Sequence, residues 1–318
     1  MQVSPSRQPR AIHVGRDGWL FLTGGSNAAL SQYRATLGRW RRLRAWSRLI
    51  EHRADRARAA RIRYLHMVVP EKLTVYPHLC ATPLVDPGQS PALRLAAAVA
   101  ARGRPRLVLD LVPPMLSAGR NQALYWRTDT HWTLAGCLVA YRELCRALGA
   151  TPQGGFTDRP FLETDSLLDL GSKMIPPVPE PYRVYGLQRD AVRTFANEIV
   201  TDYEEGRAPV SPHTAVHVVY TNPSAEADPR RLLLYGDSCA HYHPFRLTAL
   251  LAETFREVHF VWSASVDWEH VASVKPDLLV TEIAERFLAR VPDDGFDLAA
   301  ETRRRAEAAR AGIETAPV

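Results

Sequence analysis

Short apolar runs alternate with amphipathic stretches along most of the 318-residue chain. Runs of apolar and branched residues bounded by Gly, Pro or charged positions predict buried strands at residues 62–70, 107–112, 216–220, 232–235, 258–261 and 278–281. Apolar positions that recur every three or four residues predict helices at 34–63, 91–101, 134–148, 245–255 and 268–274. Strands alternating with helices predict an α/β fold in which a parallel sheet has helices on both faces.

Most of the chain is predicted to form one domain, spanning residues 12–295, because the candidate chemistry described below needs both halves. It opens with a short hairpin-like entry at 12–22. Residues 151–212 are richer in Pro, Gly and charge, and we expect an insertion near the substrate cleft there, with no regular structure at the prolines of 176–181. The two ends are expected to be flexible or helical tails, residues 1–11 and 296–318.

Composition is that of a globular protein with a real core, since 46% of residues are hydrophobic and 23% are charged. The net charge of +6 is unevenly distributed, because arginines concentrate in the amphipathic segment 34–63. A surface helix with a basic solvated face is one interpretation. The alternative is a docking surface for a membrane, an anionic polysaccharide or an acidic partner. A nucleic-acid binder is disfavoured because no recognised binding motif accompanies the charge.

The cysteines do not form a metal-binding pattern. Cys80, Cys137, Cys145 and Cys239 lack the Cys-x-x-Cys or His-rich spacing of zinc sites, so we expect no metal and no cofactor. Four scattered cysteines fit a reducing compartment. The amino terminus lacks the apolar region of a secretory signal, and no run is long enough for a transmembrane helix, which predicts a cytoplasmic protein.

Two segments a hundred residues apart carry the candidate chemistry. Residues 232–235 predict a buried strand that ends in Gly-Asp-Ser, which would expose Ser238 at the carboxyl end of the strand, where open α/β sheets place their active sites. Asp129 and His131 lie two residues apart in a stretch that we expect to be extended, so the carboxylate can orient the imidazole. Together they offer a nucleophile, a base and an orienter.

This combination resembles the SGNH hydrolase superfamily. The Asp-Thr-His-Trp motif at 129–132, placed before the serine, resembles the alginate O-acetyltransferase branch, whereas ordinary SGNH esterases carry their Asp and His after the serine. Further segments agree in order: 14–21, 69–77, 108–111, 168–173, 275–277 and 285–288. The resemblance implies an SGNH-like (flavodoxin-like) fold over roughly residues 12–290, with no chemical role assigned to the Asp-Leu-Gly element at 169–171.

The resemblance also implies a reaction: acyl transfer, with acetyl the expected group, to carbohydrate hydroxyls during polysaccharide modification. Ser238 would attack the acyl carbonyl while His131 takes its proton, giving an acyl-serine intermediate. The alternatives are a carbohydrate acetylesterase of the same fold and a non-catalytic polysaccharide-binding subunit. The acyl donor is left open, with a partner acyltransferase as one source. Alginate acetyltransferases are periplasmic, which conflicts with the missing signal unless the recorded start omits it.

Other residues near the motifs are candidates for substrate binding. The backbone N–H of Ser238 is the expected oxyanion donor, and superfamily members add an asparagine side chain, for which Asn222 is the candidate. Trp126 and Trp132 are either core aromatics or sugar-stacking rings. Polar-tipped residues that would line the acceptor site, or be ordinary surface residues, are Tyr125, Arg127, His241, Tyr242 and His243. Asp237 is expected to be structural, because its side chain should point away from the serine.

Overall fold

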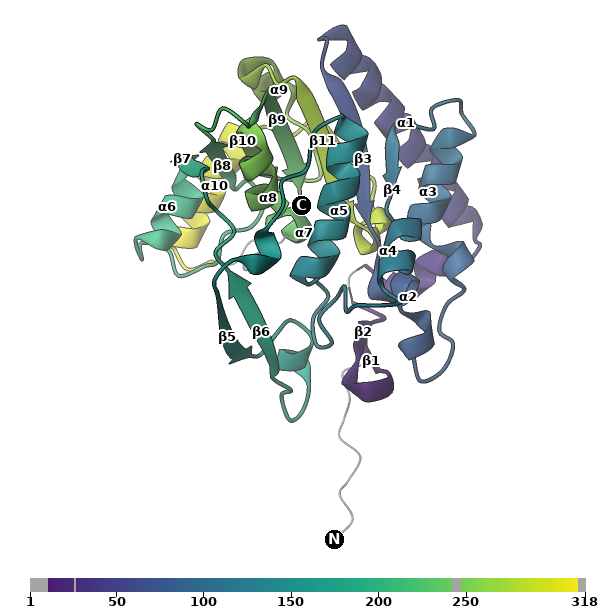
Figure 1. The fold of residues 1–318 in the computed structure, drawn as a ribbon. Coiled ribbons are helices and arrows are strands. Elements are labelled where there is room, and N and C mark those ends of the chain that lie inside the picture. Colours follow the sequence, from purple (N-terminus) through teal and green to yellow (C-terminus); the bar gives the residue numbers. More distant parts are fainter. Residues whose placement is uncertain (1–10, 26, 242–246, 314–318) are drawn as a thin grey trace.

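A central sheet of seven strands organises the protein, whose computed structural model describes residues 11–25, 27–241 and 247–313 (Figure 1). The strands lie in the order β4-β3-β11-β9-β10-β8-β7. Their bounds are β3 (Arg63–Val69), β4 (Val108–Asp110), β7 (Val192–Ala196), β8 (His217–Thr221), β9 (Asp228–Gly236), β10 (Phe255–Trp262) and β11 (Leu278–Ala284). The pairs from β4 to β10 are parallel, which confirms the predicted α/β fold, whereas β8 and β7 add an antiparallel edge that was not predicted.

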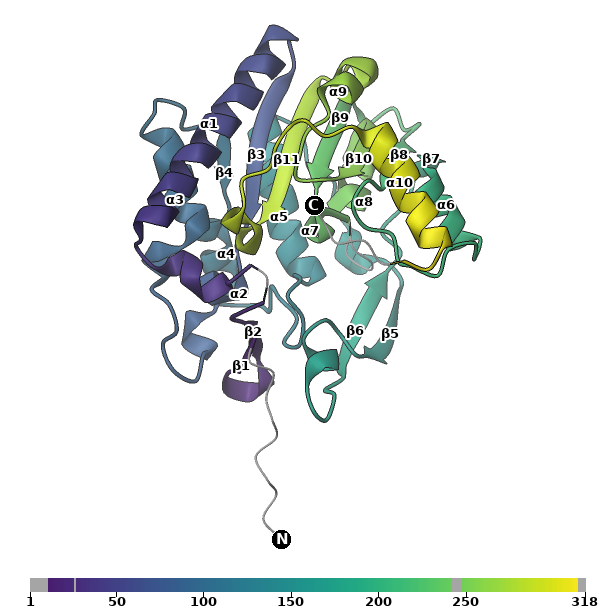
Figure 2. The same cartoon turned by 180° about the vertical axis from the view of Figure 1, so that it is seen from behind.

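Helices cover both faces of the sheet (Figures 1 and 2). One face carries α1 (Leu37–Ala59), α9 (Trp268–Val274) and α10 (Leu298–Arg310), and the other carries α5 (Leu134–Leu148), α7 (Ser238–His241) and α8 (Leu247–Thr254). Four further helices are α2 (Lys72–Val75), α3 (Pro91–Ala100), α4 (Val112–Ala118) and α6 (Glu198–Glu204). Every residue of β11 is buried, as expected of a parallel strand covered on both sides.

Two small hairpins project from the edge of the sheet at which β9 ends (Figures 1 and 2). The first pairs β1 (Ile12–Val14) with β2 (Leu20–Leu22) and confirms the predicted entry hairpin. The second pairs β5 (Phe161–Ser166) with β6 (Glu180–Tyr185). Pro181 lies inside β6, so the expectation of no regular structure at that residue was wrong. A two-stranded sheet has only edge strands, which tolerate the missing N–H of proline.

The region 151–212 is more than an insertion, because β7 is a strand of the main sheet. The carboxyl-terminal segment is likewise docked on the domain beyond residue 295. Helix α10 packs on α6, where Arg310 pairs with Asp202 (Nε to Oδ2, 2.6 Å) and Asn197 bonds Thr302 (3.2 Å). Within the described ranges, no helix has both the length and the apolar character needed to cross a membrane.

The basic helix α1 is less uniformly solvated than its sequence predicts. Trp46 and Ile50 are buried against the sheet, whereas Trp40, one of the apolar residues that recur every three or four positions in this segment, is 56% exposed. Arg53 is buried and forms an ion pair with Asp294 (2.6 Å), so one of the arginines counted on the solvated face holds the core together instead.

Helix α5 begins directly after the Asp-His motif, and a glycine permits this close approach. Thr133 caps the helix by accepting from the N–H of Gly136 (3.3 Å), and Gly149 ends it at a φ of 66°. A Cβ on Gly136 would lie 2.2 Å from the carbonyl oxygen of Leu124 and 2.9 Å from the Cβ of Trp132. Both neighbours belong to the segment that carries the motif, so the glycine fixes the distance between α5 and that segment.

We expect Gly136→Ala to lower the free energy of unfolding by about 1–3 kcal/mol, because backbone would have to move to make room. Helix propensity alone predicts the opposite sign, a gain of up to about 1 kcal/mol. The matched control is Gly38→Ala near the start of α1, where the nearest atom is 3.8 Å away on a flexible arginine, and we expect it to be neutral or slightly stabilising. Urea unfolding of both variants decides; a stabilised Gly136→Ala protein would contradict the packing argument.

Candidate active site

Ser238 is the first residue of α7 and follows the carboxyl end of β9, as predicted. The turn between them needs a glycine. A Cβ on Gly236 would lie 2.7 Å from Oε2 of Glu282 and 2.9 Å from the Cβ of Ala240. The serine is half-buried, at an edge of the sheet where parallel strands present side chains to a ligand.

Asp237 holds the turn in place. Its Oδ1 accepts from the N–H of Cys239 (2.7 Å) and its Oδ2 from the N–H of Ala284 at the end of β11 (2.7 Å). Its own N–H donates to Oε2 of Glu282 (2.9 Å). Burial, together with the nearby Asp237 charge, raises the pKa of Glu282 well above its ordinary value, which favours its neutral form. Both oxygens of Asp237 are therefore used structurally, in agreement with the expectation for this residue.

Asp129 and His131 are in contact, but not in an extended segment. They lie in a loop closed by the bridge between Tyr125 and Trp132, and Oδ1 of Asp129 accepts from both the N–H (2.8 Å) and the Nδ1 (2.6 Å) of His131. Asp129 is 2% exposed. Burial alone would raise the pKa of this carboxyl, but His131 outweighs it and holds the pKa below its ordinary value. A carboxylate on Nδ1 fixes the tautomer and leaves Nε2, on the far side of the ring from Asp129, as the candidate base.

Two buried charged side chains that the sequence did not reveal clamp the backbone of this loop. The carboxylate of Glu180, at the start of β6, accepts from the N–H groups of Arg127 (3.1 Å) and Thr128 (2.8 Å). From the other side, the Nζ of Lys72 donates to the carbonyls of Trp126 (2.9 Å) and Arg127 (3.0 Å). Lys72 belongs to segment 69–77, whose resemblance to the family could have pointed to it. Glu180 lies in a proline-rich stretch in which no motif pointed to a functional residue.

The Asp-Leu-Gly element now has a structural role beside the same loop. The N–H groups of Leu170 and Gly171 donate to the carbonyl of Thr128 (3.0 and 2.9 Å). Asp169 accepts from Thr130 (2.5 Å) and Lys173 (2.6 Å). Ligand atoms of Asp129, His131 and Asp169 lie within 4.8 Å of one another, a spacing that a metal ion could bridge. The carboxylates are already engaged by His131, Thr130 and Lys173, which favours a hydrogen-bond network over an ion site.

Both motifs lie at one edge of the sheet. The hydroxyl of Tyr125 donates to the carbonyl of Pro70, directly after β3. Val69, the last residue of β3, pairs with Ala284 of β11, whose N–H binds Asp237 in the serine turn. The Asp-His loop and the serine turn are thus tied to adjacent strand ends. Direct contact between Ser238 and His131 stays a prediction.

Two aromatic candidates for sugar binding are core residues. Tyr125 and Trp132 are each 1% exposed, and Tyr125 packs edge-on against Tyr76 (ring centroids 6.2 Å apart). This position corrects the expectation that Tyr125 lines the acceptor site, and for Trp132 it selects the core alternative over the sugar-stacking one. Trp126 is half-buried beside Tyr182.

Asn222 lies far from the serine turn, which corrects its assignment to the oxyanion hole. Its side-chain amide donates to the carbonyls of Ala252 and Glu253 (both 3.1 Å), next to the start of β10, whereas Gly236 pairs with Trp262 at the end of β10. Seven residues of strand, about 23 Å, separate the two ends.

Of the remaining candidates, Arg127 is half-exposed and lies 3.6 Å from Glu180. His241 stacks on Phe260 (4.6 Å) and binds Thr248 through Nδ1 (2.6 Å). Two further candidates lie outside the described residues: Tyr242 and His243. All four cysteines are buried free thiols.

A mostly parallel sheet with a serine turn at its carboxyl edge defines an SGNH-like α/β protein. Residues 12–170, half of the chain, match the family model described as an SGNH hydrolase-like domain, acetyltransferase AlgX, and the chain belongs to this family. Membership in a family named for an acetyltransferase assigns the protein to the SGNH-like acyl-transfer class. A search of the curated proteins found no match.

Solved structures share this fold. The O-acetyltransferase domain of Pseudomonas putida AlgJ has 18% identity and a TM-score of 0.58, over 93% of this chain and 99% of that one. A DHHW family protein from Eubacterium siraeum has 12% identity and a TM-score of 0.63, over 98% and 99%. Bacillus cereus PatB1 with a sulfonyl adduct has 14% identity and a TM-score of 0.54, over 89% and 97%. At these identities the likeness is one of fold.

We expect the Lys72 clamp to be visible in the pH dependence of stability. Burial, partly offset by Asp129 and Glu180, lowers the pKa of Lys72 to about 8 from an ordinary 10.5. Between these values the unfolded chain binds more protons than the folded one, so the stability of the wild type rises with pH. Over 2.5 pH units at 1.36 kcal/mol each, the rise is about 3 kcal/mol.

Lys72→Met removes this titrating group. The free energy of unfolding of the wild type minus that of the variant should therefore increase from pH 8 to 10.5, as measured by urea unfolding at fixed salt. Other groups titrate in both proteins and cancel in the difference. Parallel profiles would contradict a lowered pKa at Lys72.

Proposed function

We propose that this protein transfers an acyl group, with acetyl the expected one, to a carbohydrate hydroxyl through a triad of Ser238, His131 and Asp129. The observation that carries the proposal is the hydrogen bond from His131 to buried Asp129 (2.6 Å), at the edge of the sheet where Ser238 begins α7. The family assignment agrees with this chemistry.

The first half of the reaction forms an acyl-serine. Oγ of Ser238 attacks the acyl carbonyl while Nε2 of His131 takes its proton, because Nδ1 already donates to Asp129. The backbone N–H of Ser238, at the start of α7, is the proposed donor to the developing oxyanion. The tetrahedral intermediate then collapses, and the leaving group departs with the proton from the imidazolium.

The second half releases the acyl group. A sugar hydroxyl loses its proton to Nε2 of His131 and attacks the acyl-serine, after which Oγ of Ser238 recovers the proton. Asp129 stays ionised throughout the neutral range, since His131 lowers its pKa, and it stabilises the imidazolium in both halves. Water in place of the sugar turns the same machinery into an esterase.

Two structures with the same fold support an activated nucleophile and the acetyl group. The AlgJ structure is an O-acetyltransferase domain, and PatB1 is described with a sulfonyl adduct, the product expected when a sulfonyl reagent meets an activated nucleophile. We propose a polysaccharide as the acceptor, with the acyl group supplied by a partner acyltransferase. A purely structural polysaccharide-binding subunit would have no use for a buried, oriented Asp-His pair.

Removal of either the nucleophile or the base should abolish turnover of a model acetyl ester. We expect Ser238→Ala and His131→Ala each to reduce the rate by at least about 100-fold, with the double variant hardly worse, because the two side chains act as a unit. Asp129→Asn should also be damaging, since it no longer accepts the Nδ1 proton. The control is Ser31→Ala, an exposed serine whose hydroxyl bonds the carbonyl of Ala28 (2.7 Å).

Labelling with a sulfonyl fluoride separates loss of chemistry from loss of folding. Mass spectrometry should find the adduct on Ser238 in the wild type and in Ser31→Ala, and in neither Ser238→Ala nor His131→Ala proteins that keep the native circular dichroism spectrum. Additive losses in turnover, or unchanged labelling of His131→Ala, would refute the shared mechanism.

Partitioning of the acyl-serine distinguishes a transferase from an esterase. With an activated acetyl donor, we expect added oligosaccharide to reduce the yield of free acetate and to appear as acetylated sugar, because a positioned hydroxyl outcompetes water. Mass spectrometry of both products across uronic-acid and neutral oligosaccharides measures this. Acetate release that no sugar alters, without acetylated sugar, assigns the esterase reaction instead.

A further inference from the structure

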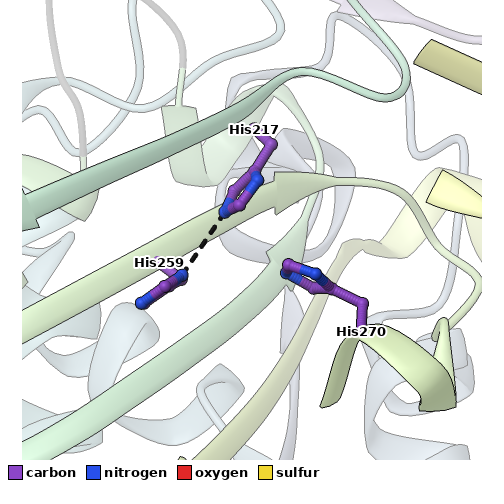
Figure 3. A group of neighbouring side chains, drawn as sticks. All are labelled: His217, His259 and His270. Carbon is purple, nitrogen blue, oxygen red and sulfur yellow. Dashed lines mark hydrogen bonds between the residues drawn. The ribbon is translucent and has the colours of Figure 1, made fainter. Parts of the chain in front are cut away.

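Three histidines converge on the face of the sheet opposite to α7. His217 comes from β8, His259 from β10 and His270 from α9 (Figure 3). The neighbouring residue Phe260 points to the other face, where it stacks on His241. Side chains alternate along a strand, so the three imidazoles lie on one face of the sheet, and Phe260 with His241 of α7 lies on the other.

The strand register and the cap of α9 position the three histidines. His217 lies opposite Val261 in the antiparallel pair of β8 and β10, and His259 lies two residues before Val261, so both histidines share one face. Helix α9 lies over that face. Asp267 caps it by accepting from the N–H of His270 (3.0 Å), which holds His270 in the first turn, with its ring toward the other two.

The spacing of the nitrogens suits a metal ion. Nε2 of His217 and Nδ1 of His259 are 3.3 Å apart. Two imidazole nitrogens bound to one tetrahedral zinc at about 2.0–2.1 Å each lie roughly 3.3–3.4 Å from one another. The candidate ligand atoms of all three histidines are within 4.8 Å of one another, so His270 must approach by about 1.4 Å at most.

The hydrogen bonds of His259 leave its Nδ1 directed toward the other two histidines. Nε2 of His259 is held by Oε1 of Glu257 (2.7 Å), which leaves Nδ1 to face His217. A carboxylate behind a histidine is the usual support of a metal ligand. Glu257 also forms an ion pair with Arg231 (2.6 Å), so the positive charge of this arginine near the histidines is neutralised by the carboxylate. Nε2 of His270 is buried and has no hydrogen-bond partner among the described residues, which is rare for a buried polar atom.

Burial favours the neutral form of these imidazoles. Burial, with contributions from the neighbouring histidines, lowers the pKa of His217 to about 3. Burial likewise lowers the pKa of His259 and of His270. A neutral imidazole is the form that ligates a metal ion.

We propose that His217, His259 and His270 form a binding site for a divalent transition-metal ion, and zinc is the ion that the site fits best. Three imidazole ligands are typical of zinc, and a water molecule would supply the fourth ligand of a tetrahedral site. The ion would join β8, β10 and α9. The site is independent of the acyl-transfer chemistry proposed above.

The test is a zinc titration of the untagged, chelator-stripped full chain, followed by calorimetry and by competition with a chromophoric chelator. We expect one zinc per chain, a higher melting temperature with zinc, and the visible spectrum of a tetrahedral site when cobalt(II) replaces it. His217→Gln and His270→Gln should each weaken zinc binding by more than the roughly 10–100-fold expected for Glu257→Gln, which removes only the support behind His259.

Two controls locate the ion. His52→Gln changes an exposed histidine of α1 and should bind zinc as the wild type does. Asp129→Asn should also bind normally, because the second metal-like group, with His131 and Asp169, lies at the other site. The proposal is overturned if the wild type binds no zinc, if folded His217→Gln and His270→Gln proteins keep wild-type affinity, or if Asp129→Asn abolishes binding.

Discussion

Buried carboxylates that accept backbone N–H groups hold the edge of the sheet on which the active site depends. Glu285, fully buried after β11, accepts from the N–H groups of Glu71 (2.7 Å) and Ala92 (3.1 Å). Glu180 does the same for the Asp-His loop and Asp237 for the serine turn. A buried charge is costly unless such donors surround it, so each carboxylate fixes the loop that satisfies it. The irregular segments of the site are therefore held in place by hydrogen bonds to carboxylates, without belonging to strands.

These hydrogen bonds connect several of the segments that resemble the family, although the segments lie far apart in the sequence. Lys72, from the segment after β3, binds the carbonyls of the Asp-His loop, and Glu71 beside it forms a buried ion pair with Arg286 (2.8 Å). Gly171, from the Asp-Leu-Gly element, packs against Thr128, where a Cβ would come within 3.1 Å of the threonine Cβ. Each segment contributes a group that another segment requires. The ordered motifs thus describe one network of contacts.

The sequence predicts the regular elements well because their signals are local. Helix α9 begins and ends at the predicted residues, with Asp267 as its cap, and α5 runs from Thr133 to Gly149 as expected. The contact of Asp129 with His131 was also predictable, since it joins neighbours in the chain. The antiparallel edge was not predictable: β7 is mostly exposed and gave no apolar signal, and the pattern of β8 does not reveal strand direction.

The histidine cluster was beyond sequence reasoning for a related reason. Spacing rules detect ligands that lie close together in the sequence, on one turn or helix. His217 and His259 lie on two different strands that pair with each other, and His270 lies on helix α9. Because β10 carries His259 on one face and Phe260 on the other, the histidine cluster and the ring of His241 lie on opposite faces of the sheet. A metal bound to the histidines would cross-link β8, β10 and α9, the side of the sheet where pairing turns antiparallel. Its effect would therefore fall on the stability of that side of the sheet, while the proposed acyl chemistry depends on the carboxylate network at the carboxyl ends of β9 and β11.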